Sequence, residues 1–180
     1  MKIKNLQLYL TDFYTYLKYF SNILIQQQMS NLASLIEQAV AAGYGANIKP
    51  LDNNAGHQWD YALKYADSDK LRYQYVYLSE YVDPKLNKNV FFIRSFAGHL
   101  SPAMSSIDLL REAEYGYVSM ICLKKMKQPD GSEKEGIYVQ TVIPAEYVNG
   151  NYVNFLAIIH EIAANADYVE KKFFAGADAN

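Results

Sequence analysis

The stretch Leu71-Arg72-Tyr73-Gln74-Tyr75-Val76-Tyr77-Leu78 decides the fold class. Tyrosine occupies every second position of its centre. Because successive side chains of a strand point to opposite faces of a sheet, this period of two predicts a β-strand with two different faces. One face carries Tyr73, Tyr75 and Tyr77, and the other carries Arg72, Gln74, Val76 and Leu78.

Stretches on both sides of this strand predict the rest of a sheet. Before it, Trp59, Tyr61 and Leu63 alternate with other side chains, and turn sequences at 52–56 and 67–69 bound that run. After it, Val90 to Ile93 is a short apolar run typical of a strand. Residues 117–125 and 136–143 predict two more strands, joined by the turn at 128–132. We therefore expect about five antiparallel strands.

Segments in which apolar residues recur at helical spacing lie before, between and after these strands. A helix over 30–42 would be capped by Ser30 and end near Gly43. Ser101-Pro102 opens a second helix, whose apolar side would be Met104, Ile107, Leu109 and Leu110. A last helix starts near Asn151, with the stripe Phe155, Ile159, Ile162, Ala166, Val169 and Phe173. The expected fold class is α+β, with helices packed on one face of the sheet in the order α-β-β-β-α-β-β-α.

Residues 1–29 predict an additional amphipathic helix. Leucine and phenylalanine recur there in steps of four and three, and we expect the helix to dock, in cis or on another subunit, through Leu10, Phe13, Leu17, Phe20 and Leu24. The alternation of Leu6, Leu8 and Leu10 also fits a short strand before a shorter helix. The expected organisation is this helix, an α+β domain over 30–175, and a frayed tail over 176–180.

Composition excludes several classes of protein. Hydrophobic residues make up 51% of the chain and charged residues 20%, which predicts an ordered core. A net charge of −2 argues against nucleic-acid binding, which needs an excess of lysine and arginine. No apolar run approaches the roughly 20 residues that span a bilayer, so no membrane partner is expected. The single cysteine, Cys122, excludes an intramolecular disulfide and favours a cytoplasmic location.

The sequence contains no recognisable catalytic or metal-binding motif. His160-Glu161 begins like a zinc helix, but Ala164 stands where the second histidine would be. Cys122 lies between Ile121 and Leu123, and a cysteine at such a position is usually a small buried apolar residue. We therefore expect no metal, no cofactor and no enzymatic activity. The alternative is an enzyme with an unrecognised site around Arg94, Arg111 and Glu112.

The order of elements from Ser30 onward resembles the fold shared by type III secretion chaperones and the YbjN-like family of bacterial regulators. Ile137 to Pro144 looks like that family's final strand, and Ala163-Ala164-Asn165-Ala166-Asp167 looks like the end of its closing helix. The resemblance implies a bacterial, chaperone-like, non-enzymatic protein that forms a homodimer. The additional N-terminal helix and the moderate pI of about 5.9 depart from the secretion chaperones.

The 17 tyrosines suggest how a partner could be recognised. Tyrosine suits interfaces because it combines a large apolar ring with a polar tip. We expect a protein segment to bind an aromatic sheet face, aided by strand pairing at a sheet edge, through Trp59, Tyr61, Tyr73, Tyr75 and Tyr77. Two alternatives stay open: the same face packs under the helices, or the protein is an immunity or anti-toxin-like partner protein.

Overall fold

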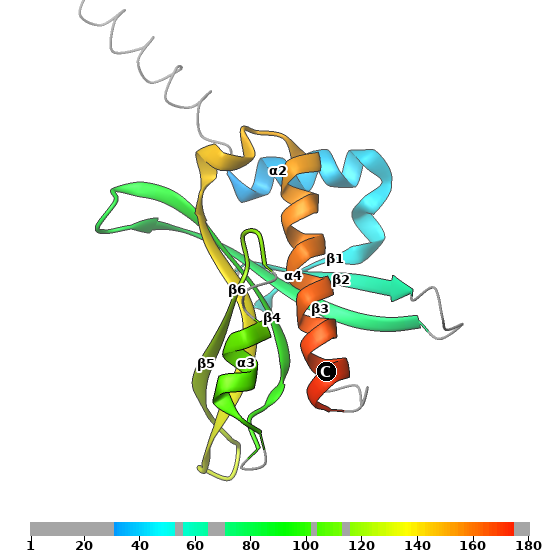
Figure 1. Cartoon of the computed structure of the whole chain (residues 1–180). Helices are drawn as coiled ribbons and strands as arrows, with labels where there is room; N and C mark the ends of the chain where they lie inside the picture. The colour runs from blue at the N-terminus through cyan, green and yellow to red at the C-terminus, as the bar shows by residue number, and fades with distance from the viewer. Residues whose placement is uncertain (1–30, 53–55, 65–70, 102–103, 113–115, 175–180) are drawn as a thin grey trace, which may run out of the picture.

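The computed structural model describes residues 31–52, 56–64, 71–101, 104–112 and 116–174 (Figure 1). The predicted N-terminal helix over 1–29 lies outside these residues, as does its proposed docking through Leu10, Phe13, Leu17, Phe20 and Leu24. The predicted frayed tail over 176–180 lies outside them as well.

Within the described residues, six strands form one antiparallel sheet in the order β1-β2-β3-β4-β6-β5. Their bounds are β1 Ile48–Pro50, β2 His57–Lys64, β3 Leu71–Asp83, β4 Lys88–His99, β5 Met120–Lys127 and β6 Glu133–Pro144. The five expected strands are all present. The additional strand, which was not expected, is β1; it is three residues long and pairs with β2. So short a run, which also ends in proline, carries no period from which a strand could be predicted.

The three α-helices of the described part of the chain pack on one face of the sheet, as expected (Figure 1). They are α2 Leu32–Ala39, α3 Ser106–Glu112 and α4 Tyr152–Phe173. Short helical turns η1 (Val40–Tyr44) and η2 (Gly45–Asn47) follow α2, and η5 (Ala145–Val148) precedes α4. The α+β fold class predicted from the sequence is confirmed. No helix within the described ranges is both long and apolar enough to cross a membrane.

The main core lies between α4 and the sheet. The predicted stripe of α4 is confirmed, because Phe155, Ile159 and Ile162 are fully buried. The ring of Phe155 meets Phe91 of β4 edge-on, with 5.8 Å between the ring centroids. Each such side chain contributes about 1.5–3 kcal/mol through burial of its apolar surface. This burial fixes which face of the sheet the helices cover.

Two helices differ in detail from the prediction. Asn31, not Ser30, caps α2, since its side chain accepts a hydrogen bond from the amide of Ser34 at 2.7 Å. In α3 the predicted apolar side is wrong in part. Leu109 is buried, whereas Ile107 and Leu110 are 63% and 66% exposed. A helix of seven residues has only two turns, so one narrow side of it can face the sheet.

The burial of the imidazole of His57, the first residue of β2, should make the stability of the protein depend on pH. Its Nδ1 atom is buried with no hydrogen-bond partner among the described residues, and burial lowers the pKa of the imidazole below 6.5. Because the unfolded chain takes up this proton at a higher pH than the folded chain, acid favours unfolding. We expect the urea midpoint to fall as the pH drops from 7 to 5, with a smaller fall in His57→Gln. Equal falls in the two proteins would contradict this assignment.

Candidate functional site

The two faces of the sheet have different surroundings. One face, with Val76, Leu78 and Ile93, is buried beneath the helices. The opposite face carries no helix that the structure describes. In Figure 1, α3 and α4 lie in front of the sheet, so this second face is turned away from the viewer. We name it the open face and define it by Tyr73, Tyr75, Tyr77, Phe92, Arg94, Phe96, Tyr138, Gln140 and Val142.

The tyrosines of β3 lie on the open face. Their neighbours Gln74, Val76 and Leu78 point to the helices and are at most 1% exposed. Tyr73 is 47% exposed, whereas Tyr75 and Tyr77 are half-buried by their neighbours on the sheet. The sequence leaves open whether the tyrosine face is free or packs under the helices. In the structure the helices cover the opposite face, so the tyrosine face does not pack under them.

Trp59 and Tyr61 do not lie with these tyrosines. They stand directly opposite Val76 and Gln74 of β3, so they share the helix-covered face. Trp59 is 1% exposed and belongs to the core. The Tyr61 hydroxyl and His160 Nδ1 of α4 are 2.6 Å apart. The prediction that both residues join the aromatic face is wrong, because a period of two gives each strand two faces but does not give the register between strands.

Arg94 occupies the middle of the open face. Its guanidinium carbon lies 5.5 Å from the ring centroid of Phe92 and 5.4 Å from that of Tyr138. Tyr77 of β3 and Gln140 of β6 stand directly opposite it on the two neighbouring strands. Burial raises the pKa of the Tyr138 hydroxyl, and the positive charge of Arg94 acts in the other direction. A cation is thus held among aromatic rings on a face that no described helix covers.

Further contacts hold these rings in place. The Tyr138 ring lies 5.3 Å from that of Phe96, and its hydroxyl donates to the sulfur of Met126 at 3.0 Å. Cys122 of β5 is directly opposite Tyr138 and is half-buried, so the expectation of a buried cysteine is wrong. Burial raises the pKa of its thiol, which disfavours the reactive thiolate. These contacts therefore hold the rings of Phe96 and Tyr138 in place on the open face.

The three residues of the enzyme alternative are not brought together. Arg94 is on the open face, whereas Arg111 lies on α3 and pairs with Asp108 at 3.0 Å. Glu112 pairs with Lys172 of α4 on the helix side. Hydrogen bonds from Lys172 and Tyr168 lower the pKa of the Glu112 carboxyl. No common site links these side chains.

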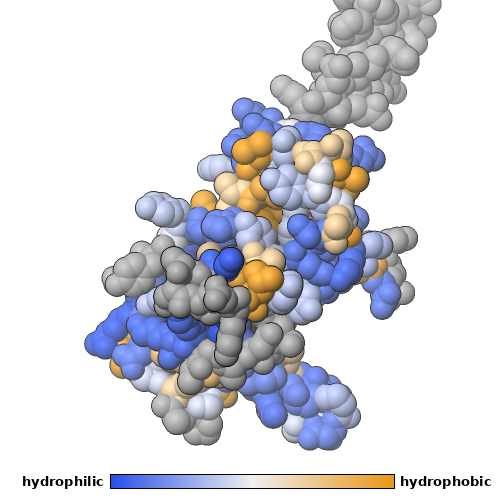
Figure 2. Space-filling model, turned by 90° about the vertical axis from the view of Figure 1, so that its right-hand side faces the viewer, coloured by the Kyte–Doolittle hydropathy of each residue, from blue (hydrophilic) through white to orange (hydrophobic). Residues whose placement is uncertain are grey.

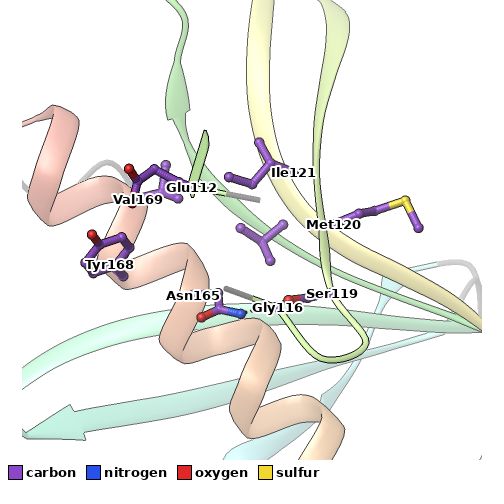
Figure 3. Close-up of a pocket in the computed structure, with 9 residues that line it drawn as sticks. Glu112, Gly116, Ser119, Met120, Ile121, Asn165, Tyr168 and Val169 are labelled. Carbon is purple, nitrogen blue, oxygen red and sulfur yellow. Dashed lines mark hydrogen bonds between the residues drawn. The ribbon is translucent and has the colours of Figure 1, made fainter. Parts of the chain in front are cut away.

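Glu112 also borders a small pocket between α3, α4 and the start of β5 (Figure 3). Asn165 of α4 donates to the Ser119 hydroxyl there at 2.8 Å. The pocket has a volume of about 20 Å³, which is room for a single water molecule. It is too small for a substrate, and its polar groups join α4 to α3 and to Ser119, the residue before β5.

A larger cleft of about 280 Å³ lies beside β2 and is lined by Tyr44, Asn47, Trp59, Asp60, Tyr61, Ala62 and Leu156. Its only carboxylate, that of Asp60, is paired with Lys49. Figure 2 views the molecule from the end where β2 and β3 extend toward the reader, and hydrophobic atoms there form small patches among hydrophilic ones. The lining of the cleft therefore offers no pair of acid and base groups.

No cluster of three or more His, Cys, Asp or Glu side chains within the described ranges could hold a metal ion. Comparisons with protein-family models, with curated proteins and with solved structures returned no match. The open face is therefore the candidate functional surface among the described residues.

Proposed function

We propose that the protein is a non-enzymatic binding module that captures a segment of another protein on the open face of its sheet. The observation that supports this most strongly is the cluster of aromatic rings around Arg94 on a face that no described helix covers. Tyrosine and arginine are enriched among the residues that contribute most to protein interfaces. A chaperone-like role of this kind is in keeping with the resemblance to the YbjN-like family, which stays a prediction.

The rigidity of the cluster favours binding. Tyr77 stands where β3 is paired with both β2 and β4, and Tyr73 and Tyr75 stand where β3 is paired with β2, so their backbone is already ordered. A tyrosine has only two side-chain torsions to fix, and it offers a large contact area for that small entropic cost. A ligand that covers these rings gains apolar burial without ordering the sheet.

We favour the face over the edge of the sheet as the contact surface. β5 is an outer strand, and a free strand edge can pair with an extended peptide. However, β5 carries Lys124, Lys125 and Lys127, all exposed. Lysines on an edge strand are a common protection against pairing with another chain. The edge pairing expected from the sequence is therefore not included in the proposal.

The open face is tested by replacing Tyr75 with serine. The probe is a peptide selected on the wild-type protein from a random peptide display library. We expect Tyr75→Ser to weaken the affinity for this peptide about 30-fold, which corresponds to the loss of a contact worth about 2 kcal/mol. The melting temperature should change little. Fluorescence anisotropy measures the binding. Tyr147→Ser is the matched control, because Tyr147 of η5 is 73% exposed and lies outside the open face.

Failure of the library to yield a binder would contradict the proposal. So would equal losses of binding in Tyr75→Ser and Tyr147→Ser. If Tyr75→Ser does not fold, Val142→Ser replaces it, because Val142 is an exposed member of the open face. Retained binding in Val142→Ser would then contradict the proposal.

A second copy of the chain is the competing occupant, since the sequence predicts a homodimer. Light scattering of the wild type and of Tyr75→Ser separates the two cases. A dimer that Tyr75→Ser dissociates would make the open face a subunit interface. A particle size that Tyr75→Ser leaves unchanged keeps the face available for another protein. We place this binding in the cytoplasm, because a single cysteine suits a reducing compartment.

A further inference from the structure

We propose that the segment bound on the open face carries a carboxylate, from an aspartate, a glutamate or a chain end, and that Arg94 pairs with it. This inference rests on the proposed function and names the chemistry that the open face selects. The occupant is a protein segment with one negative charge next to apolar or aromatic side chains.

The first support is the pairing of the arginines. The chain has three of them. Arg72 pairs with Asp167 and Glu170, and Arg111 pairs with Asp108. Arg94 forms no ion pair and no hydrogen bond with any residue that the structure describes; its contacts there are with the rings of Phe92 and Tyr138. A half-buried guanidinium without a counter-ion gains the most from a carboxylate that arrives with a ligand.

The second support is the way in which Arg94 is held. Contact between a guanidinium and an aromatic ring uses the face of the ring and leaves the N–H groups as donors. Two rings near one guanidinium restrict its rotamers before the ligand arrives, which lowers the entropic cost of binding. Carboxylate oxygens match the planar pair of N–H groups that remains.

The third support is the charge of the surroundings. Tyr77 and Gln140, directly opposite Arg94 on the neighbouring strands, are neutral. The only carboxylate on the adjoining part of β2, Asp60, is paired with Lys49. One guanidinium among neutral side chains balances one carboxylate, whereas a phosphate dianion would need a second cation close by. These charges favour an acidic segment over a phosphorylated one.

The test uses the display-selected peptide described above. We expect selected peptides to be enriched in aspartate or glutamate. Replacing the essential acidic residue by its amide, or amidating a chain end, should weaken binding to the wild type 10- to 100-fold. Arg94→Gln should remove this difference between the acid and amide peptides. Arg94→Glu should prefer a peptide in which lysine replaces the acidic residue, and a role of Arg94 in packing alone would not produce that reversal.

The outcomes separate the two proposals. If Tyr75→Ser loses binding but the acid and amide peptides bind the wild type equally, the open face stands and the carboxylate inference is wrong. If neither Tyr75→Ser nor Arg94→Gln affects binding, both the proposed function and the carboxylate inference are wrong. The peptide substitutions leave the protein unaltered, so they decide the question even if an Arg94 variant does not fold.

Discussion

Replacing Trp59 with alanine is expected to lower the free energy of unfolding by about 3–5 kcal/mol. Trp59 is 1% exposed and packs in the core, with its ring 6.2 Å from that of Tyr44. Its removal leaves a cavity that the strand pairing around β2 prevents from closing. Urea denaturation followed by circular dichroism measures the change.

Tyr73→Ala is the control for this variant, because Tyr73 is an aromatic residue on the open face of the adjacent strand and is 47% exposed. It should cost about 1 kcal/mol or less. Equal losses in Trp59→Ala and Tyr73→Ala would contradict the assignment of the two faces of the sheet.

A chain of buried polar groups beneath α4 gives the second large effect. Arg72 of β3 contacts Asp167 at 2.7 Å and Glu170 at 3.3 Å. Gln74 donates to Glu170 at 2.5 Å and accepts from the Ser95 hydroxyl at 2.9 Å. Both carboxylates are at most 2% exposed, so the protein must supply the interactions that water would otherwise give.

Arg72→Met should therefore lower the free energy of unfolding by about 3–5 kcal/mol, the usual cost of removing one partner from a buried ion pair. The loss comes from removing the ion pairs of Arg72 with the buried carboxylates of Asp167 and Glu170. Arg111→Met is the control, because its pair with Asp108 is exposed and is worth about 0–1 kcal/mol. Adding Asp167→Asn and Glu170→Gln to Arg72→Met should recover part of the stability. Equal effects of Arg72→Met and Arg111→Met would show that the buried carboxylates do not depend on Arg72.

The sequence predicts those parts of the fold that have a strong period. The alternation in 71–78 and the stripe of α4 each follow from one pattern, and both are confirmed. The short strand β1 has too few residues to show a period. The sequence predicts the wrong face for Trp59 and Tyr61 because register depends on packing between strands, which a single strand does not encode.

Two features of the structure have signals in the sequence. Phe92, Arg94 and Phe96 alternate along β4, which places Arg94 on an aromatic face. The enzyme alternative instead predicts Arg94 beside Arg111 and Glu112, which the structure keeps apart. Asp167 and Glu170 adjoin the apolar stripe of α4. Charged residues beside a buried stripe indicate a buried ion pair, but only the fold identifies Arg72 as the partner.

The most direct test of the open face is a titration of isotope-labelled protein with the display-selected peptide, followed by NMR chemical-shift mapping. We predict that the largest shifts fall on backbone amides of the open face, at Tyr75, Tyr77, Arg94 and Gln140. Shifts confined instead to the cleft beside Tyr44 and Leu156, or to the pocket beside Glu112, would contradict the account.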